Sequence, residues 1–583
     1  MSNSSNGLLT AKNASNFKLH ARTRRHKQYV TSEIEISCFR PTGLNLDPDA
    51  NCHFVRHNYH CNFDTKLINY LEFAVCTIRI DDFSWFGEVG YIVCSLVVLL
   101  FLIFSVFVMT RWFILPNVLT LFNWTTIRAY HCGILIVSTL FILPNLFKSS
   151  IICNSPKELY SLFLTESGSR AFSMYGLGLA LISINKTLHA PPFHCIVSLL
   201  VIVLGNIYVY ILLSYKTKND TLPKGEQGDL KLEGHAKFLI IVYLVYLFAQ
   251  LYDPFKSMLF RSNTIVEVIR TPEQIESENV IEDVLEGVVT TTSTEHTETT
   301  NSPFKVNFRK FYGDIFGRKY IIFNILCAPL WIILTLLIPV INENLHFHGW
   351  NKYLLSTNLI FISLPLMGYI KIEICFALVA IGFLAAGVIL YKTSATEPPR
   401  FYKVFSVFGL FTAFMIWHLL TMEADTLIHQ SLQYVIHWDL DAVVVASSSF
   451  SSSVTEMIFI YELIKYEEMD IAFGLVTGLA VYNTIGSFPA TVLQPCFDTS
   501  SFLFITSNNC TIYVFMFLMI GYTFTALCIS NFQLRRTFGM FLVIFCSLFI
   551  LYIILTAYEV VHSYGSQHSP TVLYNSFTHS NWS

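Results

Sequence analysis

A single carboxylate stands among hydroxyl groups in an apolar stretch near residue 450. Glu456 comes at the end of a run of serines and a threonine, which are Ser447, Ser448, Ser449, Ser451, Ser452, Ser453 and Thr455. A charged group inside a membrane costs about 3 kcal/mol or more on insertion scales, so a carboxylate kept there is a functional candidate. Carboxylate and hydroxyl oxygens are ligands that hard cations prefer. The pattern therefore predicts a cation site around Glu456.

The same residues also have a purely structural interpretation. Small hydroxyl residues let membrane helices pack closely. The carboxylate of Glu456 would then extend to the membrane interface or pair with Lys465. Periodicity alone favours neither reading.

The elements that would position such a site are membrane helices. The 583 residues are 53% apolar and only 13% charged, whereas soluble proteins have roughly a quarter charged residues. A membrane helix needs about 20 apolar residues. About thirteen stretches approach that length, at 89–110, 131–152, 171–188, 193–214, 236–252, 320–341, 354–370, 374–392, 403–422, 441–463, 470–493, 511–530 and 536–557. We expect an all-α polytopic membrane protein with about 12–13 transmembrane helices.

Polar segments divide these stretches into two membrane halves. The residues from 290 to 300 are almost all Thr, Ser and Glu, a composition that cannot bury enough apolar surface to form a core. A disordered cytoplasmic loop is therefore favoured there, with a small regulatory domain as the alternative. The expected regions are a polar Cys-containing segment at 1–85, membrane halves at 86–252 and 401–560, the loop at 253–319, intervening membrane helices at 320–400 and a polar tail at 561–583.

Cysteines lie in polar segments at both ends of the chain, at Cys52, Cys61, Cys76, Cys496 and Cys510. Such cysteines predict disulfides on an oxidising face. Zinc is an alternative near the N-terminus, where His53, His57 and His60 also lie, but the spacing matches no closed zinc site.

Basic residues at 309–319 and 535–536 favour the cytoplasmic side. The cysteine segments then lie outside, together with the sequon at 509–511, which predicts a glycoprotein.

Three segments in collinear order resemble the sodium/calcium exchanger superfamily, in particular its mitochondrial sodium/calcium/lithium branch. They are the Cys-containing stretch at 52–76, the run APLWIILTLLIPV at 328–340 and FQLRRTFG at 532–539. The resemblance covers most of 50–560 apart from the central loop. It implies two inverted five-helix repeats, each with a signature motif inside the membrane.

Both signature motifs depart from the pattern of that family. At 140–145 the chain keeps Pro144 but has Phe141 in place of a ligand Asn and Asn145 in place of the carboxylate. At 451–456 it keeps Ser453 and a carboxylate, Glu456, and has Ser452 in place of Asn. The partner helices are recognised by Gly176 and Gly178 in the first repeat and by Gly478, Asn483 and Gly486 in the second. The resemblance implies cation ligands at Glu456, Ser452, Ser453, Asn145 and Asn483.

Two further expectations concern the helices around the motifs. Glu423 and Asp425 end a predicted span and are expected at the membrane interface as ordinary helix-end polarity.

Inverted repeats require an even number of membrane crossings between them. Of the three stretches there, 320–341 is expected not to span, because Pro329 and Pro339 bracket its apolar run.

The sequence as a whole favours a secondary antiporter. The resemblance implies exchange of calcium against sodium, or against lithium, potassium or protons, with no cofactor. A non-transporting membrane regulator or scaffold on the same fold is the alternative. An enzyme is not expected, because no nucleophile or metal cluster accompanies the scattered His131, His189 and His194.

The surroundings of the chain can also be inferred from composition. The net charge is −3 and no dense basic cluster occurs, so the expected partners are membrane lipid and the transported cations, not nucleic acid. Sequons and the lack of an Arg-rich presequence favour the plasma membrane, whereas the resemblance makes a mitochondrial or other organellar membrane the alternative.

Overall fold

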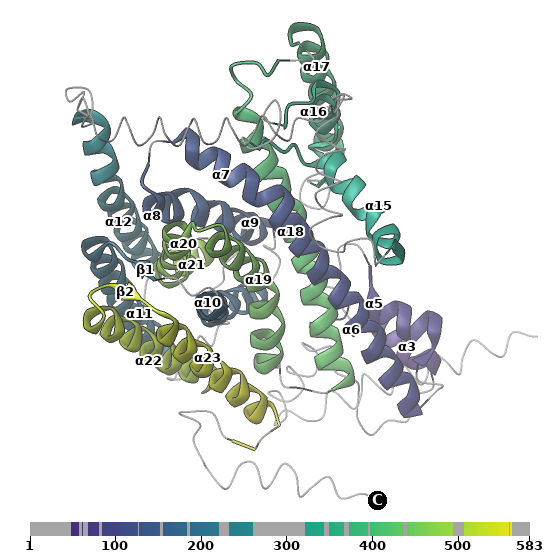
Figure 1. Ribbon diagram of the computed structural model, residues 1–583. Helices are drawn as coiled ribbons and strands as arrows, with labels where there is room; N and C mark the ends of the chain where they lie inside the picture. Colours follow the sequence, from purple (N-terminus) through teal and green to yellow (C-terminus); the bar gives the residue numbers. More distant parts are fainter. Residues whose placement is uncertain are drawn as a thin grey trace, which may run out of the picture.

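The protein is a bundle of helices with one very short two-stranded ladder (Figure 1). The computed structural model describes residues 48–57, 61, 68–80, 84–125, 127–151, 156–183, 187–220, 232–260, 321–342, 349–365, 372–394, 397–436, 438, 440–493, 507–558 and 560–561. The prediction of an all-α polytopic membrane protein is confirmed.

Seven helical segments in the described part of the chain are long and apolar enough to cross a membrane. They are Phe86–Trp124, Pro192–Leu212, Leu232–Tyr252, Glu373–Lys392, Val404–Val435, Met469–Ala490 and Arg536–Ala557. Shorter apolar helices cover Ala129–Leu143, Ala328–Leu337 and Val514–Ile529. Two long helices of the bundle, α10 and α19, are in neither group, and both carry buried polar residues, among them Ser169, Arg170, Ser453 and Glu456. Polar content explains why neither helix is in these groups.

The first half of the chain forms five successive helical rods, two of which include a π-helical segment. Pro116, in the first turn of α7, needs no hydrogen-bond partner for its nitrogen, so the rod continues past it. The elements are α6 (Ser84–Met109) continued through Thr110–Ile114 into α7 (Leu115–Trp124), α8 (Ala129–Cys132) continued through Gly133–Val137 into α9 (Ser138–Ile151), α10 (Pro156–Ser183), β1 (Leu188–His189), α11 (Pro192–Asp220) and α12 (Leu232–Phe260).

The second half repeats this series of five. Its elements are α18 (Val404–Gln430) with the π-helical Ser431–Val435, α19 (Leu440–Lys465), α20 (Met469–Val481) continued through Tyr482–Gly486 into α21 (Ser487–Val492), α22 (Ser507–Ile529), β2 (Gln533–Leu534) and α23 (Arg536–Ala557). β1 pairs with β2 in antiparallel register, Leu188 opposite Leu534. This ladder joins a connection of the first half to a connection of the second.

The two halves pack together as inverted repeats. The rod α8–α9, second in its half, packs along α20, third in the other, and α10, third in its half, packs along α19, second in the other. Both pairs run parallel, since contacts advance from Gly133–Gly474 to Ser138–Gly478 in the first and from Ser169–Ser453 to Ser173–Glu456 in the second. Successive helices of one half run antiparallel to each other. The second rod of one half can therefore run parallel to the third rod of the other half only if one half is inverted relative to the other.

Other contacts between the two halves follow the same inverted-repeat symmetry. The first rods, α6–α7 and α18, pack against each other, as do the fourth rods, α11 and α22. The fifth rod of each half packs on the third rod of the other, α12 against α21 and α23 against α10. The predicted pair of five-helix repeats therefore describes the observed packing, and α10 lies near the centre of the bundle (Figure 1).

Glycines permit the closest helix crossings. A Cβ on Gly133 would collide with the backbone oxygen of Ile471, and a Cβ on Gly474 would collide with that of Tyr130. Gly178 and Gly539 face each other in the same way, with a built Cβ on either one 2.8–2.9 Å from the oxygen of the other. Small residues at these positions let the backbones of opposite halves touch.

Three described helices lie between the halves. α15 (Ile321–Leu337) is one helix that continues through Pro329, so the helix is not broken there. The expectation that 320–341 does not span the membrane stays a prediction. α16 (Lys352–Phe361) has only 10 residues, about 15 Å at 1.5 Å per residue. It packs as a hairpin on α17 (Ile372–Lys392), which among the described residues of these three helices meets the length and composition for a span.

The predicted loop at 253–319 falls mainly outside the described residues. Its first part, up to Phe260, continues α12 and so is helical.

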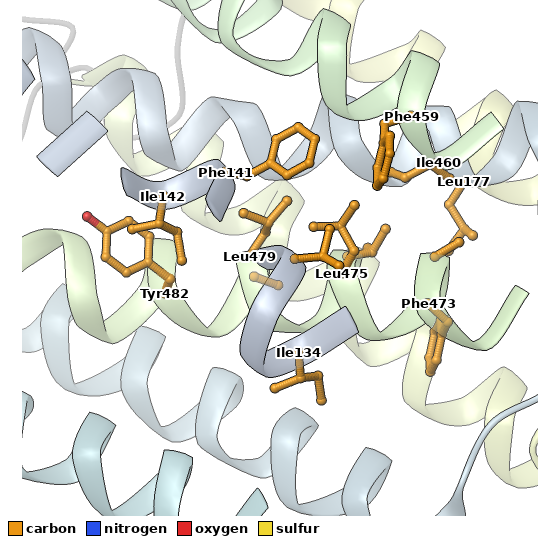
Figure 2. Packing of buried hydrophobic residues seen from close by; sticks show 14 of the residues in the cluster. Ile134, Phe141, Ile142, Leu177, Phe459, Ile460, Phe473, Leu475, Leu479 and Tyr482 are labelled. Atoms are coloured by element: carbon orange, nitrogen blue, oxygen red, sulfur yellow. The ribbon is translucent and has the colours of Figure 1, made fainter. Parts of the chain in front are cut away.

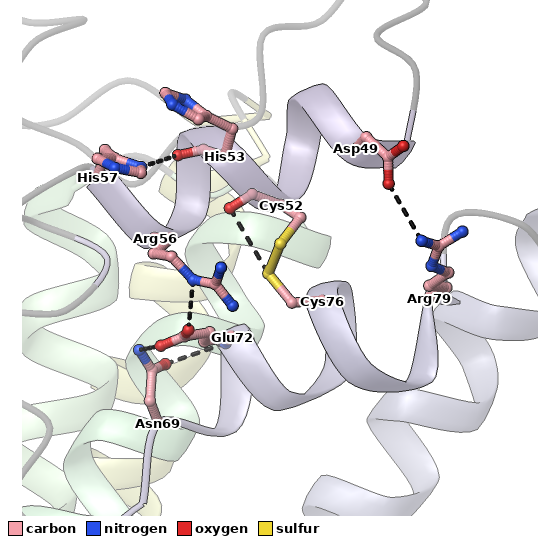
Figure 3. Close-up of a disulfide and its surroundings, with 9 residues drawn as sticks. All are labelled: Asp49, Cys52, His53, Arg56, His57, Asn69, Glu72, Cys76 and Arg79. Carbon is pink, nitrogen blue, oxygen red and sulfur yellow. Dashed lines mark hydrogen bonds and ion pairs between the residues drawn. A yellow bond between two sulfur atoms is a disulfide. The ribbon is translucent and has the colours of Figure 1, made fainter.

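The Cys-containing N-terminal segment is a folded cap (Figure 3). α3 (Pro48–His57) is joined to the π-helical Phe73–Ile78 by a disulfide between Cys52 and Cys76, and Cys61 is also disulfide-bonded. The disulfide prediction is confirmed for these three cysteines. Cys496 and the side chain of Cys510 lie outside the described residues. His53 and His57 stack on each other, ring centroids 4.0 Å apart, and His60 lies outside the described residues.

Candidate functional site

The centre of the site is a carboxylate where one helix of each half meets. Glu456 on α19 accepts a hydrogen bond from Ser173 Oγ on α10, and only 6% of its surface is exposed. It does not extend toward Lys465, which lies nine residues further along α19, or about 13 Å along the helix axis. The reading of Glu456 as a snorkelling or Lys465-paired group is therefore wrong.

Ser169 connects three helices next to Glu456. Its Oγ accepts from Asn483 Nδ2 at 2.9 Å, and its backbone oxygen accepts from Ser453 Oγ at 3.2 Å. Ser453 also donates to Ser449 O within its own helix at 2.6 Å. Three of the predicted ligands, Glu456, Ser453 and Asn483, are therefore brought together around two serines of α10.

A buried arginine completes this polar centre. Arg170 is 4% exposed, and its Nη1 lies 2.9 Å from Asn206 Oδ1 on α11 and 2.8 Å from Thr484 Oγ1. Asn206 Nδ2 approaches the same Thr484 oxygen at 3.5 Å. Successive residues of α10, Ser169 and Arg170, thus bind successive residues of the π-helical turn, Asn483 and Thr484. This turn supplies two side chains to one site, a role typical of π-helical turns at functional sites.

A small cavity of about 20 Å³ lies beside these groups. Arg170, Ser173, Asn483 and Thr523 are its polar lining, and the remaining lining residues are apolar. A space of this size holds one water molecule or one dehydrated small cation.

Of the other two predicted ligands, only Ser452 has a described side chain, and it is hydrogen-bonded within its own helix. Ser452 is partly buried, and its Oγ donates to Ser449 O at 3.1 Å. Ser449, Ser453 and Glu456 instead follow one another at helical spacing, on the face of α19 that packs on α10. Asn145 belongs to α9, but its side chain lies outside the described residues.

Phe141, at the position where the signature motif described from the sequence has an Asn, lies in an aromatic cluster, of which Figure 2 shows Phe141 and Phe459. Its ring centroid is 4.8 Å from Phe414, 5.2 Å from Trp417 and 5.4 Å from Phe459, and its side chain is 1% exposed. Phe141 therefore presents hydrocarbon at this position of the first repeat. The described site is built by α10 and α11 of the first half and by α19 and the turn at 482–486 of the second.

Glu423 and Asp425 are buried inside the protein and do not end their helix, contrary to the expectation of ordinary helix-end polarity. Only 1% of Glu423 and 8% of Asp425 is exposed, because α18 continues beyond them and the disulfide-bonded cap packs on its end. Ser448 Oγ lies 2.8 and 2.9 Å from the two Asp425 oxygens. Since Ser448 precedes Glu456 by eight residues, Asp425 lies about 12 Å from Glu456 along the axis of α19. Asp425 belongs to a second buried polar cluster, which lies nearer the cap.

The cap contacts both first rods of the repeats. Gln430 at the end of α18 accepts from Leu71 N at 3.2 Å and donates to Cys61 O at 3.0 Å. The Tyr70 hydroxyl is hydrogen-bonded to Glu423, and burial followed by this carboxylate raises the pKa of Tyr70 well above its usual value. Tyr91 of α6 and Tyr434 pack in the core of the cap.

The polar groups of α10 were not found from the sequence. The predicted span began at 171, because Arg170 and the polar residues before it lowered the local hydropathy. The available signal was the charge of Arg170 itself, next to hydroxyls four residues apart at Ser169 and Ser173. A charge beside an apolar run is a functional candidate in a membrane protein.

Comparisons with known proteins yield one distant relative, and no family model or solved structure matches the chain. The mitochondrial sodium/calcium exchanger protein of Rattus norvegicus is 20% identical over 273 residues, which is 44% of this chain and 46% of that protein. The chain thus spans under half the length of this relative. The similarity supports a loose relationship to sodium/calcium exchangers, and the relative is a transporter.

Proposed function

We propose that this chain is a cation antiporter of the sodium/calcium exchanger type, working by alternating access of its two membrane repeats around Glu456. The observation that carries the proposal is the placement of one buried carboxylate at the parallel contact of α10 with α19, one helix from each half. Inverted repeats of this kind build transporters in which the substrate site lies at the repeat interface. The 20% identical relative, a sodium/calcium exchanger protein, supports the same class.

The proposed ligands are the oxygens gathered around Glu456. Ser453 and Asn483 lie in its network, and Ser452 and Asn145 remain proposed ligands for a rearranged state of the repeats. The proposed cargo is calcium against sodium, with lithium, potassium or protons as the other candidates, and no cofactor takes part. One carboxylate neutralises only half the charge of a calcium ion.

A non-transporting regulator on the same fold is the second candidate. Phe141 favours it, because a ring packed against Phe414, Trp417 and Phe459 contributes no oxygen ligand. Such a protein would act through partners and would show no ion dependence at Glu456.

The chain is a multi-pass membrane protein, and the membrane in which it resides is part of the proposal. The disulfides of the cap need an oxidising side, which supports a plasma-membrane or secretory location with membrane lipid as the surrounding partner. The sequon at 509–511 would then carry glycan. An organellar membrane is the alternative that the mitochondrial relative suggests.

Gradient-driven flux in liposomes tests the proposal. Purified protein is reconstituted, and uptake of calcium, sodium, lithium, potassium and protons is measured in turn against an opposing gradient. We expect saturable exchange in the wild type and its loss in Glu456→Gln, whose amide preserves size and hydrogen bonding.

Glu462→Gln is the matched control. Glu462 lies on the same helix, is 1% exposed and stands 3.8 Å from Arg111, away from the α10 network. Exchange that survives in Glu462→Gln but not in Glu456→Gln would identify the site. Folded wild-type protein that moves none of these ions would favour the regulator.

A further inference from the structure

Asp425 is a buried carboxylate that the proposed transport site does not use. Ser448 Oγ lies 2.8 and 2.9 Å from its two oxygens, and only 8% of Asp425 is exposed. A serine hydroxyl has one proton, whereas a carboxylate offers about four acceptor positions. The ion pairs in the described part of the chain do not include Asp425. The carboxylate therefore has acceptor capacity beyond its bond with Ser448.

The surroundings of Asp425 follow from the register of α18 against α19. Phe414 of α18 and Phe459 of α19 both pack on Phe141. Asp425 comes 11 residues after Phe414, and Ser448 comes 11 residues before Phe459. Both contacts thus fit one antiparallel register, in which each turn of α18 lies opposite a turn of α19.

This register brings two further hydroxyls close to the carboxylate. Ser451 lies one helical turn after Ser448, and Thr421 lies one turn before Asp425, so both are one turn further from the cap. Only 3% of Ser451 and 6% of Thr421 is exposed. Thr421 Oγ1 donates to His418 O at 2.9 Å, and a hydroxyl that donates its proton still has lone pairs to offer. Each helix therefore supplies a buried hydroxyl oxygen at this level.

Ser451 differs from its neighbours in its hydrogen bonding. Ser452 and Ser453 donate to Ser449 O within α19, a local bond that serine commonly makes inside a helix. Ser451 Oγ is buried and has no hydrogen-bond partner in the part of the chain that the structure describes. Buried hydroxyls normally have one. Since Ser451 follows Ser448 at helical spacing, its unpaired oxygen stands beside the carboxylate that Ser448 contacts.

We infer that Asp425, Ser448, Ser451 and Thr421 form a second cation site, for a hard monovalent cation, sodium or lithium. Carboxylate and hydroxyl oxygens are the ligands that hard cations take, and calcium usually collects about six to eight of them, several from carboxylates. One carboxylate with three hydroxyls matches a single positive charge better. The site lies about 12 Å from Glu456 along α19, and binding there does not depend on transport.

The experiment measures thermal unfolding of the whole chain in detergent, with Glu456→Gln present throughout so that the proposed transport carboxylate cannot contribute. Sodium, lithium or calcium chloride replaces N-methyl-D-glucamine chloride at constant ionic strength. We expect the unfolding midpoint to rise saturably with sodium or lithium and to show no saturable rise with calcium. A midpoint that responds to none of these ions, or to calcium at least as strongly as to sodium, would overturn the inference.

Two carboxylate variants, each added to Glu456→Gln, locate the site. Asp425→Asn removes the negative charge and should abolish the sodium response. Glu423→Gln removes a buried charge two residues away on the same helix, where Tyr70 is hydrogen-bonded to it, and should keep the response. Equal sodium responses in the two folded variants would contradict the assignment of Asp425.

A milder pair of variants tests the site even if Asp425→Asn does not fold. Ser451→Ala should raise the half-saturating sodium concentration by about three- to tenfold, because one ligand is lost. Ser406→Ala is the control, since this buried serine of α18 donates to Lys403 O and lies about five turns from Asp425. An unchanged sodium response in Ser451→Ala would overturn the site.

The outcomes also separate this inference from the proposed function. A sodium response that requires Asp425, in protein that moves no ion in liposomes, keeps the second site and overturns the antiporter. Flux that requires Glu456, in protein whose Glu456→Gln variant shows no sodium response, keeps the antiporter and overturns the second site.

Discussion

Arg170 of the first half donates to Thr484 of the second half at 2.8 Å, inside the helix bundle and away from water. The bond ties α10 to the π-helical turn between α20 and α21, and Asn206 holds the same guanidinium from α11. The two repeats are thus connected by a buried charge one residue away from Ser169, which anchors Asn483. The electrostatics of the site and the contact between the repeats depend on the same residue.

Loss of the acceptor for Arg170 should destabilise the bundle. Thr484→Val leaves a charged donor without that partner, and hydrogen bonds to charged groups contribute about 1.5–3 kcal/mol. We expect a lower midpoint of thermal unfolding in detergent. Thr412→Val is the control, since the hydroxyl of the equally buried Thr412 donates to Phe408 O within its own helix. Equal losses in the two variants would contradict the importance of the Arg170 contact.

The glycine crossing between α8–α9 and α20 should not accept a methyl group. Gly474→Ala places a Cβ against the backbone oxygen of Tyr130, so the helices must separate. Overpacking of this kind costs about 1–3 kcal/mol. Gly521→Ala, where nothing lies within 4 Å, should be neutral or slightly stabilising. Thermal unfolding of both variants would reveal whether the two repeats touch at this point.

The cap should depend on its disulfide. Removing the Cys52–Cys76 bond, which closes a loop of 24 residues, costs about 3 kcal/mol by chain-entropy reasoning. The double variant Cys52→Ser/Cys76→Ser should expose the cap to limited proteolysis while the helix bundle stays intact. Replacing the exposed Cys94 alone should change nothing. Protease resistance that is unaffected by the double variant would show that packing on α6 and α18 suffices.

The contact between the cap and Glu423 should also stabilise the protein. Tyr70→Phe removes a donor from a carboxylate that is 1% exposed, at an expected cost of about 1.5–3 kcal/mol. Because the pKa of Tyr70 is raised, its hydroxyl stays protonated and remains a donor at ordinary pH. Unfolding followed at neutral pH should show a lower midpoint for Tyr70→Phe than for the wild type. An unchanged midpoint would mean that other neighbours satisfy Glu423.

The sequence predicted the membrane class, and three of the five ligands it proposed lie in one hydrogen-bond network in the structure. Apolar runs identify spans one at a time, so most helices were found near their observed bounds. Glu456, Ser453 and Asn483 were found through residue type and family resemblance. Asn145 and the predicted 253–319 loop stay predictions, since they lie outside the described residues in whole or in large part.

Features that depend on packing between distant segments could not be read from the chain. Arg170 looked like the polar edge of a span until α11 and the turn at 482–486 supplied its partners. Asp425 looked like an exposed helix end, because its burial depends on the continuation of α18 and on the cap that packs over the end of that helix. Pro329 looked like a breaker, yet α15 continues through it. In each case, neighbours from elsewhere in the chain decided the environment.

The most direct test of the central claim is cation flux into liposomes that contain the wild-type protein or Glu456→Gln, with equal folded protein confirmed in each. The account predicts gradient-driven, saturable cation exchange in the wild type and none in the variant. Equal flux in both would contradict the assignment of Glu456 as the transport site.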